Sequence, residues 1–442
     1  MELIPRFHQE LFVKKTIDKI KEGSSKFLWG WKCRAGKTYG VGHLIDAYYN
    51  EFDLVNALII TPAPSETLTQ FGTEMFHKFT NFRHLNIIEI KKGKDLENLN
   101  YDNNNVIVIS KQLLDNYVKN DRKTDFHKQL FDLIIFDENH YGGTTNNSKE
   151  ILKLFNSNFS NQIFLTATYQ KTLAQYKIPE DCQFFWNVED EMYCKNRDIN
   201  KLKIKHGIDV ECFLDDENLD DKLKFYDNMP SMHLLSTILE QEQFQKIKDN
   251  LENSEQGFSM DVLFSINKEN KQFSFERQVK ELLKYICGND SKCIFNRIIS
   301  SSRKFNSRTL LNNENFTTQL WFLPFGIGLK IDDLSKNLKK IMLQFEEFED
   351  YEIMIINSKI KEIKNLKNHI LNTEINAKNN NKKGLILLAG NQCSLGITLP
   401  LVDVVFLMNN ITSSDKIMQM MYRCMSETSD GSKKIGFVVD FN

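Results

Sequence analysis

The sequence has no long hydrophobic run. No stretch approaches the roughly 20 consecutive apolar residues that a membrane-spanning helix needs, and the first residues lack the charged start and apolar run of a secretory signal. The eight cysteines include no Cys-x2-Cys pair, and no compact Cys/His set has the spacing of a zinc site. We therefore expect a soluble, intracellular protein whose cysteines are reduced thiols.

An excess of charge of one sign is also missing. Lys and Arg total 57 against 59 Asp and Glu, a net charge of −2, which excludes a histone-like protein held to nucleic acid by bulk charge. A local basic channel stays open, because binding follows the charge near the ligand and not the total. The hydrophobic fraction of 41% and the charged fraction of 26% are close to the globular average, which argues against wholesale disorder.

Short apolar, β-branched runs alternate with longer amphipathic stretches in two parts of the chain. This alternation is typical of βαβ units with a parallel sheet, and at roughly 150 residues a domain the length predicts about three domains. We expect these at residues 1–178, 179–315 and 316–442, the middle one mostly helical and heavily charged. The predicted strands are Phe27–Trp31, Ala57–Thr61, Asn86–Ile90, Val106–Ser110, Leu133–Phe136, Ile163–Thr166, Leu320–Leu323, Ile353–Ile356, Leu385–Leu388, Val404–Met408 and Gly436–Val439.

A phosphate-binding turn follows the first predicted strand, where residues 32–38 read Lys-Cys-Arg-Ala-Gly-Lys-Thr before a helical pattern. A strand, a tight turn and a helix N-terminus form an anion site from backbone N–H groups and the helix dipole. Gly36 lets the backbone approach phosphate, Lys37 would reach the β- and γ-phosphates, and Thr38 would hold Mg²⁺. We also expect Arg34 of this turn to contact the cofactor. The strict pattern has a glycine five positions before Gly36, where this sequence has Trp31, so an ordinary turn stays open as the alternative.

An acidic pair follows the predicted strand Leu133–Phe136. A carboxylate at the carboxyl end of a parallel strand is where a nucleotide-bound Mg²⁺ lies. Asp137 would orient the metal, and Glu138 would polarise the attacking water. The alternative is a solvated Asp-Glu turn, which the phosphate-binding turn upstream makes the weaker interpretation.

Together with that turn, Asp137-Glu138-Asn139-His140 resembles the DEAH/DExH form of motif II in superfamily 2 helicases and translocases. The chain is similar in particular to type III restriction-subunit-like helicases and to relatives in large DNA viruses. The resemblance covers both α/β parts and implies two RecA-like parallel-sheet domains with an intervening, mostly helical segment. It also implies ATP and Mg²⁺ as cofactors and a nucleic acid as partner, with DNA favoured over RNA.

Further motifs of the first part lie in the order that this family has. Arg6-Phe7-His8-Gln9 resembles the adenine-sensing element, in which Gln9 would bond the base edge. Thr61 and Ser110 end strands at positions similar to motifs Ia and Ib, and would contact nucleic-acid phosphates. Thr166-Ala167-Thr168 is similar to motif III, which links the nucleotide state to the nucleic-acid side.

The second part carries motifs similar to IV, V and VI. These are Leu320–Pro324, Ser394–Pro400 with Asp403 after it, and Gln419-Met420-Met421-Tyr422-Arg423. The resemblance implies that Gln419 binds the cofactor, that Thr398 contacts nucleic acid, and that Arg423 is an arginine finger for the transferring phosphoryl group. A helix-surface arginine is the alternative for Arg423.

Three positions depart from the family pattern. Arg34 stands in the phosphate-binding turn where glycine is common, Thr398 where motif V usually has an acidic residue, and Ser426 where motif VI usually has a second arginine. We expect an ATP hydrolase with Lys37 and Arg423 as catalytic residues beside the acidic pair. A slow or partner-dependent enzyme stays open, and so does a non-hydrolysing nucleic-acid-binding scaffold.

A basic stretch, Lys292–Arg308, lies in the middle segment and has Phe295 and Phe305 among its cations. This composition suits phosphate contact with base stacking, so we expect nucleic acid to contact Arg303, Lys304 and Arg308. A solvated loop is the alternative. The chain could also be the motor subunit of a restriction or transcription complex, with a protein partner. If the protein is viral, we expect it in the host cytoplasm or the virion.

Overall fold

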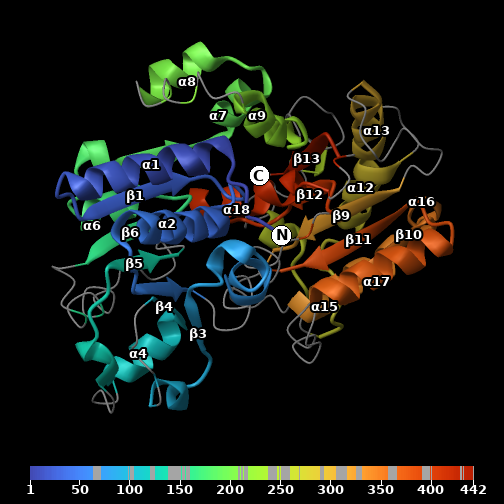
Figure 1. Cartoon of the computed structure of the whole chain (residues 1–442). Coiled ribbons are helices and arrows are strands. Elements are labelled where there is room, and N and C mark those ends of the chain that lie inside the picture. Colours follow the sequence, from blue (N-terminus) through green and yellow to red (C-terminus); the bar gives the residue numbers. More distant parts are fainter. Residues whose placement is uncertain are drawn as a thin grey trace. The chain divides into compact units, whose positions relative to one another are not determined.

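Figure 1 shows a computed structural model of the chain. The structure describes residues 1–62, 71–97, 99, 104–119, 125–137, 151, 155, 160–207, 210, 213, 218–236, 246–247, 249, 259–267, 269–288, 293–304, 316–324, 331–356, 366–390, 399, 401–428, 431 and 433–441. The chain divides into two compact units, Met1–Asp227 and Asn228–Asn442. Their boundary falls inside the segment 179–315 that we expect between the two α/β parts, and the division at residues 178 and 315 stays a prediction.

The first unit contains a seven-stranded sheet in which all strands are parallel. The strand order is β3-β4-β2-β5-β6-β1-β7, and the inner strands β2, β4 and β5 are buried along their whole length. Such continuous burial is typical of parallel sheets with helices on both faces. The strands are β1 (Lys26–Trp31), β2 (Ala57–Thr61), β3 (Asn86–Ile90), β4 (Asn105–Ser110), β5 (Leu133–Phe136), β6 (Asn161–Leu165) and β7 (Gln183–Trp186).

Helices of the first unit pack around this sheet, and Figure 1 shows α1 and α2 side by side, with α7 and α9 near one end of α1. α1 buries Phe7, Leu11, Phe12, Val13 and Ile17, so it packs over more than one of its faces. The helices are α1 (Phe7–Lys21), α2 (Lys37–Phe52), α4 (Lys111–Lys119), α6 (Gln170–Gln175), α7 (Val188–Lys195), α8 (Ile199–His206) and α9 (Leu219–Asp227). Short π or 3-10 turns are η1 (Gly72–Phe76), η2 (Thr80–Phe82), η3 (Gly93–Leu96), η4 (Asp125–Lys128) and η6 (Glu180–Cys182).

The second unit contains a six-stranded sheet, again parallel throughout its described strands, in the order β10-β11-β9-β12-β13-β8. Its strands are β8 (Ser231–Ser236), β9 (Thr317–Phe322), β10 (Tyr351–Ile356), β11 (Gly384–Ala389), β12 (Val404–Leu407) and β13 (Ile435–Asp440). Its helices are α11 (Met260–Leu263), α12 (Glu276–Cys287), α13 (Ile294–Lys304), α15 (Ile331–Met342), α16 (Glu346–Glu349), α17 (Leu366–Asn379), α18 (Ser414–Met421) and the 3-10 turn η9 (Tyr422–Met425).

The middle segment contributes to both units. Its strand β7 pairs with β1, and its strand β8 pairs with β13, although the sequence predicts few strands here. Its helices α12 and α13 bury Leu282, Ile286 and Phe295 in one cluster with Trp321 and other residues of the second sheet. Phe295 packs near Phe406 with 7% of its surface exposed, so its ring belongs to the core of the second unit.

All eleven predicted strands are present, and their bounds differ from the predicted ones by at most three residues. Among the residues described, no helix combines the length and the apolar character that crossing a bilayer requires.

Candidate nucleotide site and the helices that support it

The candidate residues of the first unit lie at the carboxyl ends of the strands of its sheet, which we call the carboxyl edge. Because all its pairs are parallel, the turn after β1, Asp137 after β5, and Thr61 and Ser110 at the ends of β2 and β4 lie at the same edge. Ligands of open parallel sheets bind at this edge. Thr61 and Ser110 are register partners.

The turn between β1 and α2 has two residues in left-handed backbone conformation. Arg34 has φ of 67° and Gly36, the N-cap of α2, has φ of 77°. The positive φ at position 36 favours glycine, and a Cβ there would lie 2.6 Å from Nε2 of Gln9, so the end of the Gln9 side chain would have to move. The family pattern has glycine where this chain has Arg34, and the positive φ of this residue favours glycine. Arginine at this position therefore has a conformational cost.

Trp31 occupies the position of the missing first glycine because β1 continues through it. Its ring is fully buried and stacks on Trp29, with 4.5 Å between ring centroids. A Cβ at Gly40 of α2 would lie 2.6 Å from this ring. Gly40 therefore lets α2 pack directly on Trp31, a role that the spacing of the sequence did not reveal.

Two side chains of α1 fix consecutive carbonyl groups of the turn. The Nε2 atom of His8 donates a hydrogen bond to the carbonyl oxygen of Ala35 at 2.8 Å, and Nε2 of Gln9 donates to that of Gly36 at 2.9 Å. A trans peptide holds its C=O and N–H in opposite directions. The N–H groups of Gly36 and Lys37 therefore point away from these α1 side chains.

The turn thus fits a phosphate group, since its N–H groups share one side at the start of a 16-residue helix and Gly36 has no side chain to block the approach. The ammonium group of Lys37 is buried and donates to the carbonyl oxygens of Trp31 and Lys32, at 3.4 and 3.5 Å. Thr38 is partly buried in the first turn of α2. The roles of Gln9, Lys37 and Thr38 toward a nucleotide stay predictions.

The first residue of the turn forms a buried ion pair with α7. The Nζ atom of Lys32 lies 2.9 Å from Oε2 of Glu191, and its backbone N–H donates to the carbonyl oxygen of Trp186 at 2.8 Å. Both charged side chains are almost inaccessible to solvent. This pair joins the turn to a segment for which the sequence suggested no function.

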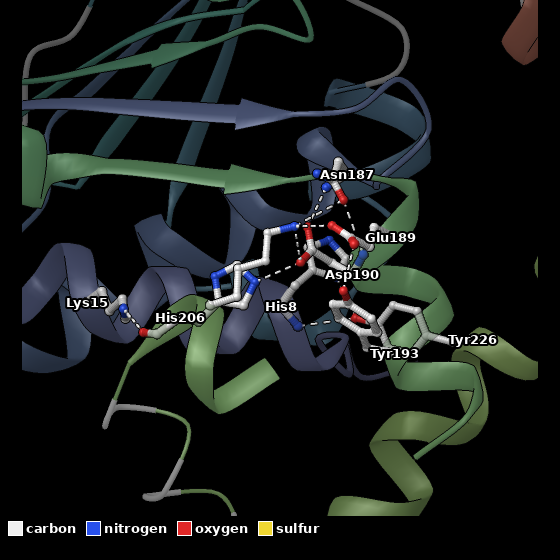
Figure 2. Close-up of polar contacts among 9 residues, drawn as sticks. His8, Lys15, Asn187, Glu189, Asp190, Tyr193, His206 and Tyr226 are labelled. Carbon is white, nitrogen blue, oxygen red and sulfur yellow. Dashed lines mark hydrogen bonds and ion pairs between the residues drawn. The ribbon is translucent and has the colours of Figure 1, made fainter. Parts of the chain in front are cut away.

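A second polar network joins α7 to α8, as Figure 2 shows. Asp190 is fully buried and accepts hydrogen bonds from Nε2 of His206 at 3.0 Å and from the backbone N–H of Asn187 at 2.7 Å, while Lys205 lies 2.8 Å away. Burial raises the pKa of Asp190, but the bonds from His206 and Lys205 outweigh this and hold it below its ordinary value. Lys15 of α1 donates to the carbonyl oxygen of His206 at 2.6 Å, which fastens α8 to α1.

Other residues of the predicted site lie at the carboxyl ends of strands of the first sheet, as the sequence predicts. Thr61 and Ser110 have no exposed surface, and Oγ of Ser110 accepts the N–H of Leu113 at the start of α4, at 3.3 Å. The N–H of Asp137 donates to the carbonyl oxygen of Ile60 at 2.9 Å. Their binding roles stay predictions.

In the second unit, Gln419 on α18 and Arg423 in η9 are also buried. Arg303 and Lys304 lie on α13, where the structure describes their backbone alone. Glu138, Thr398 and Arg308 lie outside the described residues.

Asp403 has a structural role in the second unit. It precedes β12, at the amino end of that strand, and its carboxylate accepts the N–H of Thr318 at 3.0 Å. Its own N–H donates to the carbonyl oxygen of Thr318 at 2.8 Å. These bonds join the starts of two neighbouring strands.

Comparisons with known proteins agree with this geometry. Residues 2–171 match the protein family described as "Type III restriction enzyme, res subunit". No curated protein matches the sequence. The resemblance to type III restriction subunits is therefore confirmed. The matched residues all lie within the first unit.

Two solved structures are similar to almost the whole chain. One is the ATP-dependent Type ISP restriction-modification enzyme LlaBIII bound to DNA, with a TM-score of 0.57, 13% identity, and coverage of 100% of this chain and 28% of that one. The other is a fragment from Vibrio vulnificus YJ016 described as an HsdR subunit of a type I restriction enzyme, with a TM-score of 0.53, 13% identity, and coverage of 99% and 64%. This chain therefore spans less than two thirds of either. The similarity shows the fold, which is a pair of RecA-like α/β units.

Proposed function

We propose that the chain is an ATP-dependent nucleic-acid helicase or translocase, which couples ATP hydrolysis to movement on DNA. The turn between β1 and α2 carries the proposal, because its carbonyl groups are fixed by His8 and Gln9 and its N–H groups face the other way, at the edge that also holds Asp137. The match of residues 2–171 to the res subunit of type III restriction enzymes supports the proposal. The ATP-dependent restriction enzyme LlaBIII, which has the same fold, supports ATP as the nucleotide.

In this proposal, each residue of the site has a stated task. The N–H groups of Gly36 and Lys37 bind phosphate oxygens, and the ammonium group of Lys37 neutralises their charge. Thr38 and Asp137 hold Mg²⁺, and Glu138 polarises the attacking water. ATP bound with Mg²⁺ supplies the phosphoanhydride bond.

Further residues contact adenine, the transferring phosphoryl group and nucleic acid. Gln9 bonds the adenine edge, Gln419 contacts the nucleotide, and Arg423 stabilises negative charge on the phosphoryl group. Nucleic acid contacts the first unit at Thr61 and Ser110. In the second unit it contacts Thr398, Arg303, Lys304 and Arg308.

ATPase assays with single- and double-stranded DNA and RNA test the proposal. We expect hydrolysis that DNA stimulates, and its loss in Lys37→Ala and Glu138→Gln, with Lys14→Ala of α1 as a surface control. Turnover that persists in both site variants would falsify the helicase assignment. Binding of nucleic acid without any turnover would favour the non-hydrolysing scaffold.

A second candidate is the motor part of a restriction complex, without strand separation of its own. It is favoured by the fact that the chain spans 28% and 64% of two restriction proteins with the same fold. Triplex displacement reports translocation, and strand displacement reports unwinding. Activity in the first assay alone supports the motor part, and activity in both supports a helicase.

A further inference from the structure

His8 lies at the centre of a chain of hydrogen bonds that starts in α9. Its Nε2 bonds to the carbonyl oxygen of Ala35 at 2.8 Å, and its Nδ1 lies 2.5 Å from the hydroxyl oxygen of Tyr226. The ring is fully buried and stacks on Trp186, with 4.6 Å between centroids and 14° between planes. Figure 2 shows His8 beside Tyr226.

The direction of each bond follows from the chemistry of the groups. A carbonyl oxygen only accepts, so the proton of His8 is on Nε2. In a neutral imidazole Nδ1 is then an acceptor, and the Tyr226 hydroxyl donates to it. Burial lowers the pKa of His8 and raises that of Tyr226, so both groups hold the protonation states that these bonds need.

Tyr226 is itself held in place by the segment that follows β7. It is one residue from Asp227, the last residue of the first unit. The guanidinium group of Arg197 donates to both carboxylate oxygens of Asp227, at 2.7 and 3.0 Å, and also to Asp220 at 3.0 Å. Such paired bonds fix both position and orientation, so Arg197 fastens α9 to the end of α7.

We propose that Tyr226 is a positioning residue for the phosphate-binding turn. Its hydroxyl group fixes the tautomer of His8 that holds the Ala35 carbonyl, and this keeps the N–H of Gly36 directed toward the phosphate. The inference rests on the proposed function for its nucleotide. It assigns α9, at the point where the chain leaves the first unit, a part in nucleotide binding.

The test compares Tyr226→Phe with Tyr193→Phe in the full chain. Tyr193 of α7 is the matched control, because its hydroxyl donates to Glu189 at 2.6 Å and does not contact the turn. Titration with ATP and Mg²⁺ measures affinity, and steady-state hydrolysis separates KM from kcat. We expect Tyr226→Phe to weaken ATP binding and raise KM by about three- to tenfold, the worth of one hydrogen bond, with kcat at saturating ATP retained. Tyr193→Phe keeps wild-type values.

A double-mutant cycle and a spectroscopic measurement make the result specific. A Gln side chain at position 8 can donate to the Ala35 carbonyl through its amide, and it has no tautomers for Tyr226 to fix. In a His8→Gln background, Tyr226→Phe should therefore change the affinity for ATP by less than about twofold. Nitrogen NMR of histidine-labelled protein, with His8→Gln for assignment, should show the Nε2-protonated tautomer in the wild type and its partial loss in Tyr226→Phe. Thermal unfolding shows that each variant is folded.

The outcomes separate the two proposals. If the wild type binds ATP and Tyr226→Phe binds it equally well, the role of Tyr226 is refuted while the proposed function stands. If the wild type binds no ATP, the proposed function fails, and so does the assignment of Tyr226 to nucleotide binding. A wild-type His8 protonated on Nδ1 overturns the hydrogen-bond chain whatever the nucleotide data show.

Discussion

The ammonium group of Lys32 lies 2.9 Å from Oε2 of Glu191, and both side chains are buried where the turn between β1 and α2 meets α7. Removing two charges from water is costly, and their attraction offsets that cost only while both partners are present. The pair therefore couples the first residue of the turn to a helix far away in the sequence.

Replacing one partner of this pair should be more damaging than replacing both. We expect Lys32→Met or Glu191→Leu alone to lower the free energy of unfolding of the first unit by about 3 kcal/mol, because each leaves a buried charge without its counter-ion. The double variant should be closer to wild type. Urea unfolding followed by tryptophan fluorescence measures this, since three of the four tryptophans lie in the first unit.

The matched control is the exposed pair Lys14–Asp18, with 2.9 Å between the charged atoms. Lys14→Met should change stability by less than about 1 kcal/mol, because solvent screens an exposed pair. Additive effects of the two buried replacements would contradict the coupling between Lys32 and Glu191.

The sequence predicted the sheets well because their inner strands are buried on both faces. Runs such as Leu133–Phe136 are continuous and apolar, and they stand out from the amphipathic helices between them. The sequence did not predict β7 and β8, which are edge strands. Partly buried and buried residues alternate in β7, and Leu234 of β8 is 54% exposed, so neither forms a continuous buried run.

The candidate site was predictable only where local spacing defines it. The turn that contains Gly36 follows β1, and Asp137 follows β5, so the sequence pattern predicts that both lie at the carboxyl ends of their strands. The contact between His8 and Tyr226 joins residues 218 positions apart, and no local periodicity specifies such a pair. The conformational cost at Arg34 likewise became visible only through its φ.

Arg34 should be replaceable by glycine with a gain in stability. Its φ of 67° costs a side-chain-bearing residue about 1–2 kcal/mol, and the extra freedom of glycine in the unfolded chain offsets part of the gain. We expect Arg34→Gly to be more stable than Arg34→Ala by about 0.5–1 kcal/mol in urea unfolding. Ala is the control, because it removes the side chain and keeps the strained backbone. Equal stability of the two variants would argue against the left-handed conformation.

Gly40 should not tolerate even a methyl group. A Cβ there would lie 2.6 Å from the ring of Trp31, so α2 would have to move. We expect Gly40→Ala to lower stability by about 1–3 kcal/mol, as overpacking does, and to weaken ATP binding because α2 starts at the turn. Gly93→Ala is the control, since no atom lies within 4 Å of its added Cβ. Adding Trp31→Phe to Gly40→Ala should recover part of the loss, and a purely additive double variant would contradict the predicted clash.

Stability of the first unit should fall as the pH decreases from 7.5 to 5, in part through His8. Burial, with nearby Arg6, Lys32 and His206, holds the pKa of His8 well below its ordinary value of 6.5, and the bond to Ala35 only partly opposes this. The unfolded chain therefore binds a proton below about pH 6.5 that the folded chain does not bind. The stabilisation is complete above that pH and is lost as the pH falls toward the folded pKa.

Burial also lowers the pKa of His43 in α2, which contributes a slope of the same sign. His8→Gln should therefore reduce the slope of unfolding free energy against pH without abolishing it. The reduction should be at most about 1.4 kcal/mol per pH unit, the value for one proton. Urea unfolding at pH 7.5, 6.5, 5.5 and 5.0 measures the slope, with His369→Gln in the second unit as the control variant. A slope in His8→Gln equal to that of the wild type would show that the folded protein protonates His8 as readily as the unfolded chain does, which contradicts the lowered pKa of His8.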